Sequence, residues 1–264
     1  MSREDLLKRD VELICGLWDD RDDKLVKEVQ ICEFSGTVLK ALNAPDIKGD
    51  VGKTINLILS NCIEKIGDRP YSSGVTTNLL GADADLLLLE IRKLSKGDVV
   101  TGDFKCVNCG TPNNVQIDIG NTEIFYPETE KFNIQKWKWL FTVSNETKGV
   151  EVVYRLPRLK DRSVMTRAIK DNEPFIALLN LASSCVVEWN GKTGPFPNDF
   201  LLQKPPRLYE WALEEFMLHA NTAGPNLDMI VSCFNCNHET ALTMEASDFL
   251  YPKVQNLRRK SRNR

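Results

Sequence analysis

The spacing of apolar residues along the chain separates helical from extended segments. Residues 2–25 are predicted to form a mostly polar helix, because apolar side chains recur there at helical spacing. This stripe consists of Leu6, Val11, Ile14 and Leu17 or Trp18. A short strand at Val29–Ile31 and a small helix near Thr37–Leu42 are expected to follow.

Two longer helices are predicted next. The first is amphipathic, with a buried stripe of Ile55, Ile58, Leu59, Cys62 and Ile66. The second begins at Asp83 or Asp85, either of which could cap its first turn, and it ends at Gly97.

Strand patterns dominate the middle of the chain. Val99–Lys105 and Val115–Ile119 alternate apolar and polar residues, and Lys136–Val143 is expected to pair with Val150–Leu156 across a polar turn. Residues 158–222 are predicted to be helical, with a break in a segment rich in glycine and proline, and with Pro206 opening the last helix.

Two short cysteine motifs carry the clearest chemical signal. Cys106-Val-Asn-Cys109 and Cys233-Phe-Asn-Cys236 each follow a strand-like segment and precede another, and about 120 residues lie between them. We call each C-x-x-C turn a knuckle. Gly110 and Asn237 follow the two knuckles, where the turn needs a positive φ that glycine adopts freely and asparagine tolerates.

Four cysteine sulfurs from two knuckles are the ligand set of a structural zinc ion. We therefore expect one zinc ion per chain, and its predicted ligands are Cys106, Cys109, Cys233 and Cys236. Four protein ligands leave no coordination position for water, so the site is expected to be structural and not catalytic. It would close the long connection between the knuckles.

Two other interpretations of the knuckles stay open at this point. A thioredoxin-like redox pair would precede a helix, which lowers the pKa of the thiol, and neither knuckle is followed by a helical pattern. The cysteines could also be ordinary buried thiols. That is the expected role of the other four cysteines, which are Cys15, Cys32, Cys62 and Cys185.

The sequence thus predicts an α+β fold with three parts. These are a helical N-terminal part, a small antiparallel zinc-ribbon-like sheet formed by the two distant knuckles, and an inserted, mainly helical subdomain. The expected regions are 1–97, 98–156, 157–225, 226–252 and a basic C-terminal tail over 253–264.

Composition is that of a folded, soluble protein. Hydrophobic residues make up 42% of the 264 residues and charged residues 27%. The longest aliphatic run, Leu86–Leu89, is too short to cross a membrane. The first ten residues are too charged for a secretory signal, so the cysteines are expected to be reduced thiols in a cytosol.

Catalysis is not expected. The chain has two histidines, and no nucleophile–base pair or paired carboxylates stand out. Nucleic-acid binding is an alternative function, through the six basic residues of the tail and a Trp-Lys strand around Lys136–Trp139. The net charge of −3 and the acidic body argue against it.

The segment from Val29 to Ile119 resembles the baseplate (hub) protein family of T-even-type contractile-tailed bacteriophages. The order of its motifs carries the resemblance. They are Glu33-Phe34 with the Val38–Leu42 helix, Ile58–Cys62, Asp85–Gly97, Phe104-Lys-Cys106-x-x-Cys109, Val115–Ile119 and the later pair Leu156-Pro157.

This resemblance implies a non-enzymatic late protein of the virion, a structural or assembly component of the tail baseplate hub. Its implied partners are other baseplate hub and tail-tip proteins. It would occupy the host cytoplasm during assembly and the tail baseplate afterwards. A small-molecule substrate, a membrane span and a nucleic-acid partner are not expected.

Overall fold

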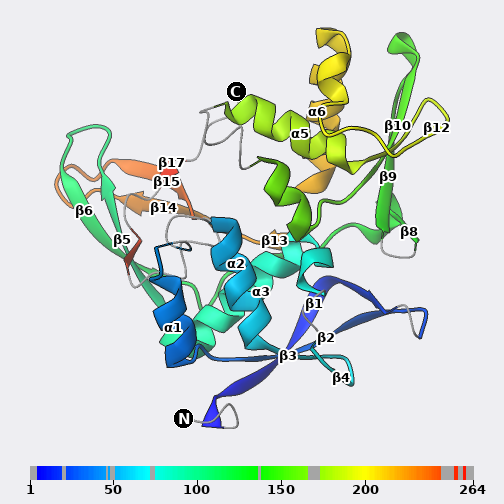
Figure 1. The fold of residues 1–264 in the computed structure, drawn as a ribbon. Helices are drawn as coiled ribbons and strands as arrows, with labels where there is room; N and C mark the ends of the chain where they lie inside the picture. Colours follow the sequence, from blue (N-terminus) through cyan, green and yellow to red (C-terminus); the bar gives the residue numbers. More distant parts are fainter. Residues whose placement is uncertain are drawn as a thin grey trace.

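The computed structural model describes residues 5–19, 22–45, 47, 51–71, 75–135, 138–165, 173–244, 253–254 and 258–259. Over these residues the fold is α+β with mostly antiparallel sheets, which confirms the predicted class (Figure 1). The described α-helices are α1 (Gly36–Leu42), α2 (Val51–Cys62), α3 (Gly81–Lys96), α5 (Pro174–Cys185) and α6 (Pro206–Ala220).

The N-terminal part begins with strands, so the predicted helix over residues 2–25 is wrong. β1 (Lys8–Asp19) and β2 (Lys24–Cys32) form an antiparallel hairpin. β3 (Ile63–Ile66) and β4 (Arg69–Pro70) extend it to a four-stranded sheet in the order β1-β2-β3-β4.

A bulge explains the misleading spacing in β1. The register shifts between Glu12 and Leu17, where Gly16 has a φ of +87° and Leu13 to Leu17 are all buried. A bulge adds residues to one strand, so strict alternation is lost and apolar residues fall three or four apart.

The helices before residue 97 match the predictions more closely. The Ser35 side chain accepts a hydrogen bond from the backbone N–H of Val38 and caps α1. Gly97 ends α3 with a φ of +78°. The predicted stripe of α2 is too long by one turn, because the chain turns into β3 after Cys62 and Ile66 lies in that strand.

Neither Asp83 nor Asp85 caps α3, contrary to both predicted options, because the helix already begins at Gly81. Asp83 has another role. Its carboxylate is fully buried and accepts hydrogen bonds from the backbone N–H groups of Cys15 (2.9 Å) and Gly16 (3.1 Å). Asp83 therefore joins α3 to the bulge of β1. Leu80 occupies the N-cap position and makes no side-chain capping bond.

The segment between the knuckles holds a second sheet as well as helices. β8 (Asn133–Gln135), β9 (Lys138–Asn145), β10 (Val150–Arg155), β11 (Val186–Trp189) and β12 (Lys192–Thr193) form it in the order β12-β11-β10-β9-β8. The predicted β9–β10 hairpin is confirmed, and Pro206 opens α6 as expected. The expectation of a mainly helical insertion is only partly met, because β11 and β12 complete this sheet. Lys136 and Trp137 lie outside the described residues.

Two hydrophobic cores lie side by side. One joins the N-terminal sheet, α1–α3 and the bases of the knuckle hairpins. The other fills the space between the second sheet, α5 and α6, around the stacked rings of Phe141, Tyr154 and Phe216. Val11 packs against both cores. An ion pair of 2.9 Å between Arg162 and Asp85 also links the inserted region to α3.

Each knuckle lies on its own hairpin, at the left of Figure 1. β5 (Val99–Lys105) pairs with β6 (Pro112–Asp118), and β14 (Asp228–Ser232) pairs with β15 (Glu239–Thr243). The two hairpins belong to separate sheets among the described strands, so the prediction of one shared ribbon sheet is wrong.

The remaining short strands pair with distant segments of the chain. β7 (Ile124–Phe125) pairs with β13 (Gly224–Pro225) and brings together the two ends of the insertion. In the basic tail, β16 (Lys253–Val254) pairs with β5 and β17 (Arg258–Arg259) pairs with β15. The other tail residues lie outside the described part of the chain.

Candidate metal centre

The first knuckle is a tight turn held by its own backbone. The N–H of Gly110 donates to the carbonyl of Cys106 at 2.9 Å, and the N–H of Cys106 donates to the carbonyl of Thr111 at 2.9 Å. Gly110 has a φ of +73°, as its position in the sequence predicts. β5 and β6 continue on either side, so the turn is fixed at the tip of a hairpin.

The second knuckle repeats this geometry. Asn237 donates to the carbonyl of Cys233 at 2.9 Å, and Cys233 donates to the carbonyl of His238 at 3.0 Å. The φ of Asn237 is +55°, which confirms the predicted left-handed position. His238 therefore contributes its carbonyl to the turn.

The structure brings all four predicted sulfurs into one cluster. Their Sγ atoms lie within 4.8 Å of one another. The Sγ atoms of Cys106 and Cys236 are 3.7 Å apart, and those of Cys109 and Cys233 are 3.6 Å apart. A tetrahedron with metal–sulfur bonds of about 2.3 Å has edges of about 3.8 Å, so these separations fit four thiolates around one zinc ion. They are far longer than the ~2.05 Å of a disulfide bond.

Asparagine side chains cross between the knuckles and contact the sulfurs. The Asn108 amide donates to Sγ of Cys236 at 3.6 Å, and the Asn235 amide donates to Sγ of Cys109 at 3.7 Å. Such hydrogen bonds orient metal ligands and stabilise their negative charge. Both knuckles read Cys-apolar-Asn-Cys, so the repeated asparagine is the signal in the sequence for these contacts, and cysteine spacing alone does not reveal them.

Asn113 on β6 adds a third link that the sequence did not reveal. Its side chain is buried, its amide donates to the carbonyl of Thr111 at 2.8 Å, and its Oδ1 accepts from the backbone N–H of Phe234 at 2.9 Å. The two knuckles are thus joined by a side-chain-to-backbone bond in addition to the sulfur cluster.

The environment of Cys109 favours the thiolate. The sulfur of Cys109 lies 3.1 Å from the Thr111 hydroxyl, and hydrogen bonding with Thr111 and Asn235 lowers the pKa of the Cys109 thiol to about 5. Zinc binds thiolate and not thiol, so a low pKa reduces the cost of removing the proton.

The remaining cysteines fit the role of core residues. Cys15, Cys32, Cys62 and Cys185 are fully buried, and none belongs to the four-sulfur cluster. The redox interpretation loses support as well, because β6 and β15 follow the knuckles where a thioredoxin-like motif would have a helix.

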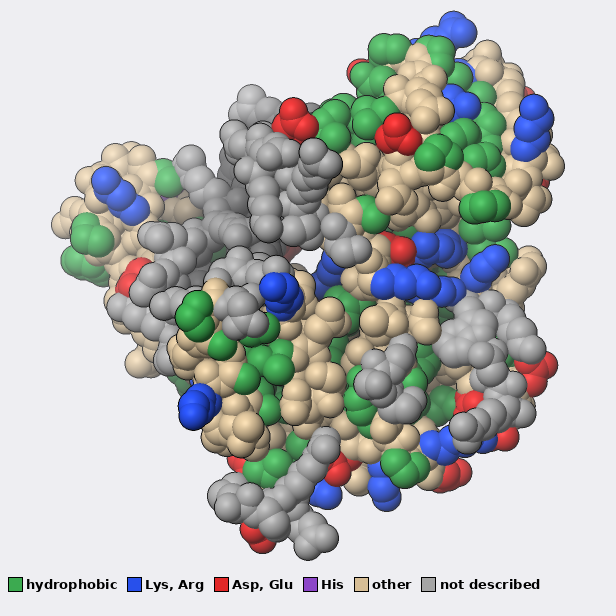
Figure 2. All heavy atoms as spheres, viewed as in Figure 1, with side chains coloured by type: hydrophobic (Ala, Val, Ile, Leu, Met, Phe, Trp, Pro, Cys, Tyr) green, Lys and Arg blue, Asp and Glu red, His purple; other side chains and the backbone are tan. Residues whose placement is uncertain are grey.

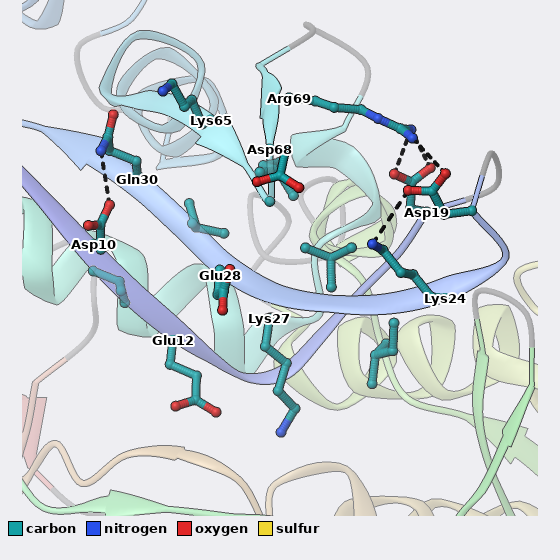
Figure 3. A pocket seen from close by; sticks show the side chains of 17 residues that line it. Asp10, Glu12, Asp19, Lys24, Lys27, Glu28, Gln30, Lys65, Asp68 and Arg69 are labelled. Carbon is teal, nitrogen blue, oxygen red and sulfur yellow. Dashed lines mark hydrogen bonds and ion pairs between the residues drawn. The ribbon is translucent and has the colours of Figure 1, made fainter.

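A large hollow lies elsewhere, on the N-terminal sheet. This groove has a volume of about 1090 Å³ and is lined by charged side chains of β1 to β4 (Figure 3). Arg69 contacts Asp19 and Asp22 there. Figure 2 shows acidic and basic side chains intermixed along this lower edge of the molecule. Among its described lining residues the groove has no histidine, serine or cysteine.

The four-sulfur cluster on this α+β scaffold is a candidate metal centre, and its donor set suits a structural zinc ion. Residues 35–251 match the family model described as T4 bacteriophage base plate protein, which covers most of the chain. The chain therefore belongs to this family, as its motif order indicated. No curated protein and no solved structure matches.

Family membership makes the chain a component of the phage tail that interacts with other tail proteins. None of the described helices has the length and apolar character required to cross a membrane.

Proposed function

We propose that this protein is a non-enzymatic structural or assembly component of the baseplate hub, stabilised by one structural zinc ion. Membership of the baseplate protein family supports the hub proposal, and the convergence of four sulfurs within 4.8 Å supports the zinc proposal. The proposed ligands are Cys106, Cys109, Cys233 and Cys236. Their tetrahedral spacing leaves the metal no open position for a substrate.

In this proposal the metal ion joins the two knuckles, which flank a large inserted segment of the chain. Regions 98–156 and 226–252 supply the knuckles, and the second sheet with α5 and α6 lies between them in sequence. Without a cross-link the chain must close this connection at an entropic cost, and metal binding would offset it. The β7–β13 pair also joins the two ends of the segment that lies between the knuckles in sequence.

The partners would be other hub and tail-tip proteins, first in the host cytoplasm and then in the virion. The described part of the chain supports a rigid scaffold for such contacts. It contains two adjacent hydrophobic cores. In the proposal the metal ion holds the two knuckle hairpins together. No catalytic residue is proposed.

Co-purification from infected cells tests the hub assignment. We expect tagged protein to retain baseplate proteins after a high-salt wash, because contacts through apolar surfaces depend little on salt. A variant with Arg258, Arg259 and Lys260 changed to alanine should retain the same proteins.

The nucleic-acid alternative predicts a different result. Binding to phosphates weakens steeply with salt, so nucleic acid would be recovered at low salt and lost at high salt. Recovery of nucleic acid without tail proteins, abolished in the alanine variant, would contradict the hub proposal.

A further inference from the structure

A crevice lined by Trp18 and Trp139 lies between the N-terminal hairpin and the inserted sheet. Residues of β1, β2, β8 and β9 line it, together with Asn78 and Leu80, which precede α3. Trp18 comes from β1 and Trp139 from β9, so the crevice lies at the junction between elements that are more than a hundred residues apart in sequence.

Both indole N–H groups are buried without an acceptor. The Nε1 atoms of Trp18 and Trp139 are shielded from solvent and donate to no other group in the described structure. Trp139 as a whole is only 4% exposed, and the ring of Phe132 packs edge-on against it with 5.5 Å between ring centroids. A buried donor that has lost its water without gaining an acceptor destabilises a fold, so such donors normally have a partner.

The lining determines the chemistry of that partner. It includes the side chains of Lys138, Gln135 and Asn78, and no aspartate or glutamate is among the described lining residues. Lys138 therefore supplies positive charge, and the two amides supply both donors and acceptors. The volume of about 20 Å³ suits a single small species, since one water molecule needs roughly 10–15 Å³.

We propose that this crevice binds one small hydrogen-bond acceptor, a halide ion or a water molecule, shared by the indole N–H groups of Trp18 and Trp139. The bound species pins the β1–β2 hairpin to the inserted sheet. This hairpin precedes residue 35, so it lies outside the segment that matches the baseplate family. The site therefore couples an element outside the family match to the part of the chain that matches the family.

Indole N–H resonances of the full-length protein, labelled with ¹⁵N-tryptophan, test the proposal. Trp18→Phe and Trp139→Phe identify the two signals, and the indoles of Trp189 and Trp211 serve as controls. Sodium bromide replaces sodium glucuronate at constant ionic strength. If a halide binds, the Trp18 and Trp139 signals shift together and saturate at the same concentration, while the control signals stay in place.

If water is the ligand, bromide leaves both signals unchanged and both show a nuclear Overhauser effect to a long-lived water molecule. In the halide case, Lys138→Gln should weaken the apparent bromide affinity. The matched change Lys148→Gln, next to the ring of Trp211, should not. Signals that respond in neither arm, or a response from only one of the two indoles, would overturn the proposal.

Discussion

Asn113 Oδ1 accepts a hydrogen bond from the backbone N–H of Phe234 at 2.9 Å and so joins the two knuckles across 121 residues of sequence. The bond is independent of the metal, because both atoms belong to groups that are not ligands. It shows that the knuckles are matched to each other by their protein framework as well as by their sulfurs.

Asn113→Ala should destabilise the fold by about 1–3 kcal/mol, because it leaves the Phe234 N–H without its acceptor. It should also weaken metal affinity by roughly 10- to 100-fold. Asn114→Ala is the matched control, since Asn114 makes an exposed bond to Asp103 and should change stability by less than about 0.5 kcal/mol. Urea unfolding and competitive zinc titration measure both effects, and equal losses for the two variants would argue against the bridge.

Loss of a proposed ligand should cost more than loss of a core thiol. We expect Cys106→Ser to destabilise the protein by about 4 kcal/mol or more, because the metal is lost with the ligand. Cys185→Ser, at a fully buried position outside the cluster, should have a milder effect.

The double variant Cys106→Ser/Cys236→Ser provides a sharper comparison. Both changes remove the same metal ion, so the second should add little to the first. Cys106→Ser and Cys185→Ser share no partner and should be additive. Additive losses for Cys106 and Cys236 in thermal unfolding would mean that no common ion binds them.

Asp161 holds a buried ion pair in the inserted region. It binds Arg155 through two hydrogen bonds of 2.6 and 2.9 Å and also accepts from the backbone N–H of Arg158. Asp161→Ala should cost about 3–5 kcal/mol, because the Arg155 guanidinium stays buried without its counter-charge. Glu128→Ala breaks the exposed pair with Lys131 and should cost less than about 1 kcal/mol. Chemical denaturation of the two variants side by side distinguishes these outcomes.

Asp83 makes the stability of the fold depend on pH. Burial raises the pKa of its carboxyl to about 6, against the stabilising effect of the Cys15 and Gly16 N–H groups. The folded protein therefore binds the proton more tightly than the unfolded chain, whose ordinary value is 3.8. The resulting stabilisation is present below about pH 4 and is lost as pH rises through about 6.

Asp83→Asn removes this titration. The urea midpoint of the native protein should fall more between pH 4 and 6 than that of the variant, and the two should run parallel above pH 7. Both proteins carry the same knuckles, so the difference between them isolates Asp83. Identical profiles over the whole range would refute its raised pKa.

The features that the sequence predicted well are those set by local chemistry. The turn at Cys106–Cys109 requires a positive φ at the next residue, and Gly110 provides it. α3 ends where Gly97 follows its last apolar turn, and the β9–β10 hairpin follows from plain alternation. Each of these depends on residues that lie close together along the chain.

The errors involve residues whose partners are distant in sequence. Asp83 looked like a helix cap because its contact with the β1 bulge, 67 residues earlier, leaves no local trace. The bulge itself broke the alternation of β1 and gave it helical spacing. The separate sheets of the two knuckle hairpins could not be predicted either, because facing sulfurs do not require paired strands.

Metal content tests the central claim most directly. The protein should be purified under reducing conditions without chelator, and its zinc measured by elemental analysis against protein concentration. One zinc ion per chain is the predicted result, lost in the Cys106→Ser/Cys236→Ser variant and retained in Cys185→Ser. A folded native protein with no metal, or with zinc unaffected by the double change, would contradict the proposal that the two knuckles close around one ion.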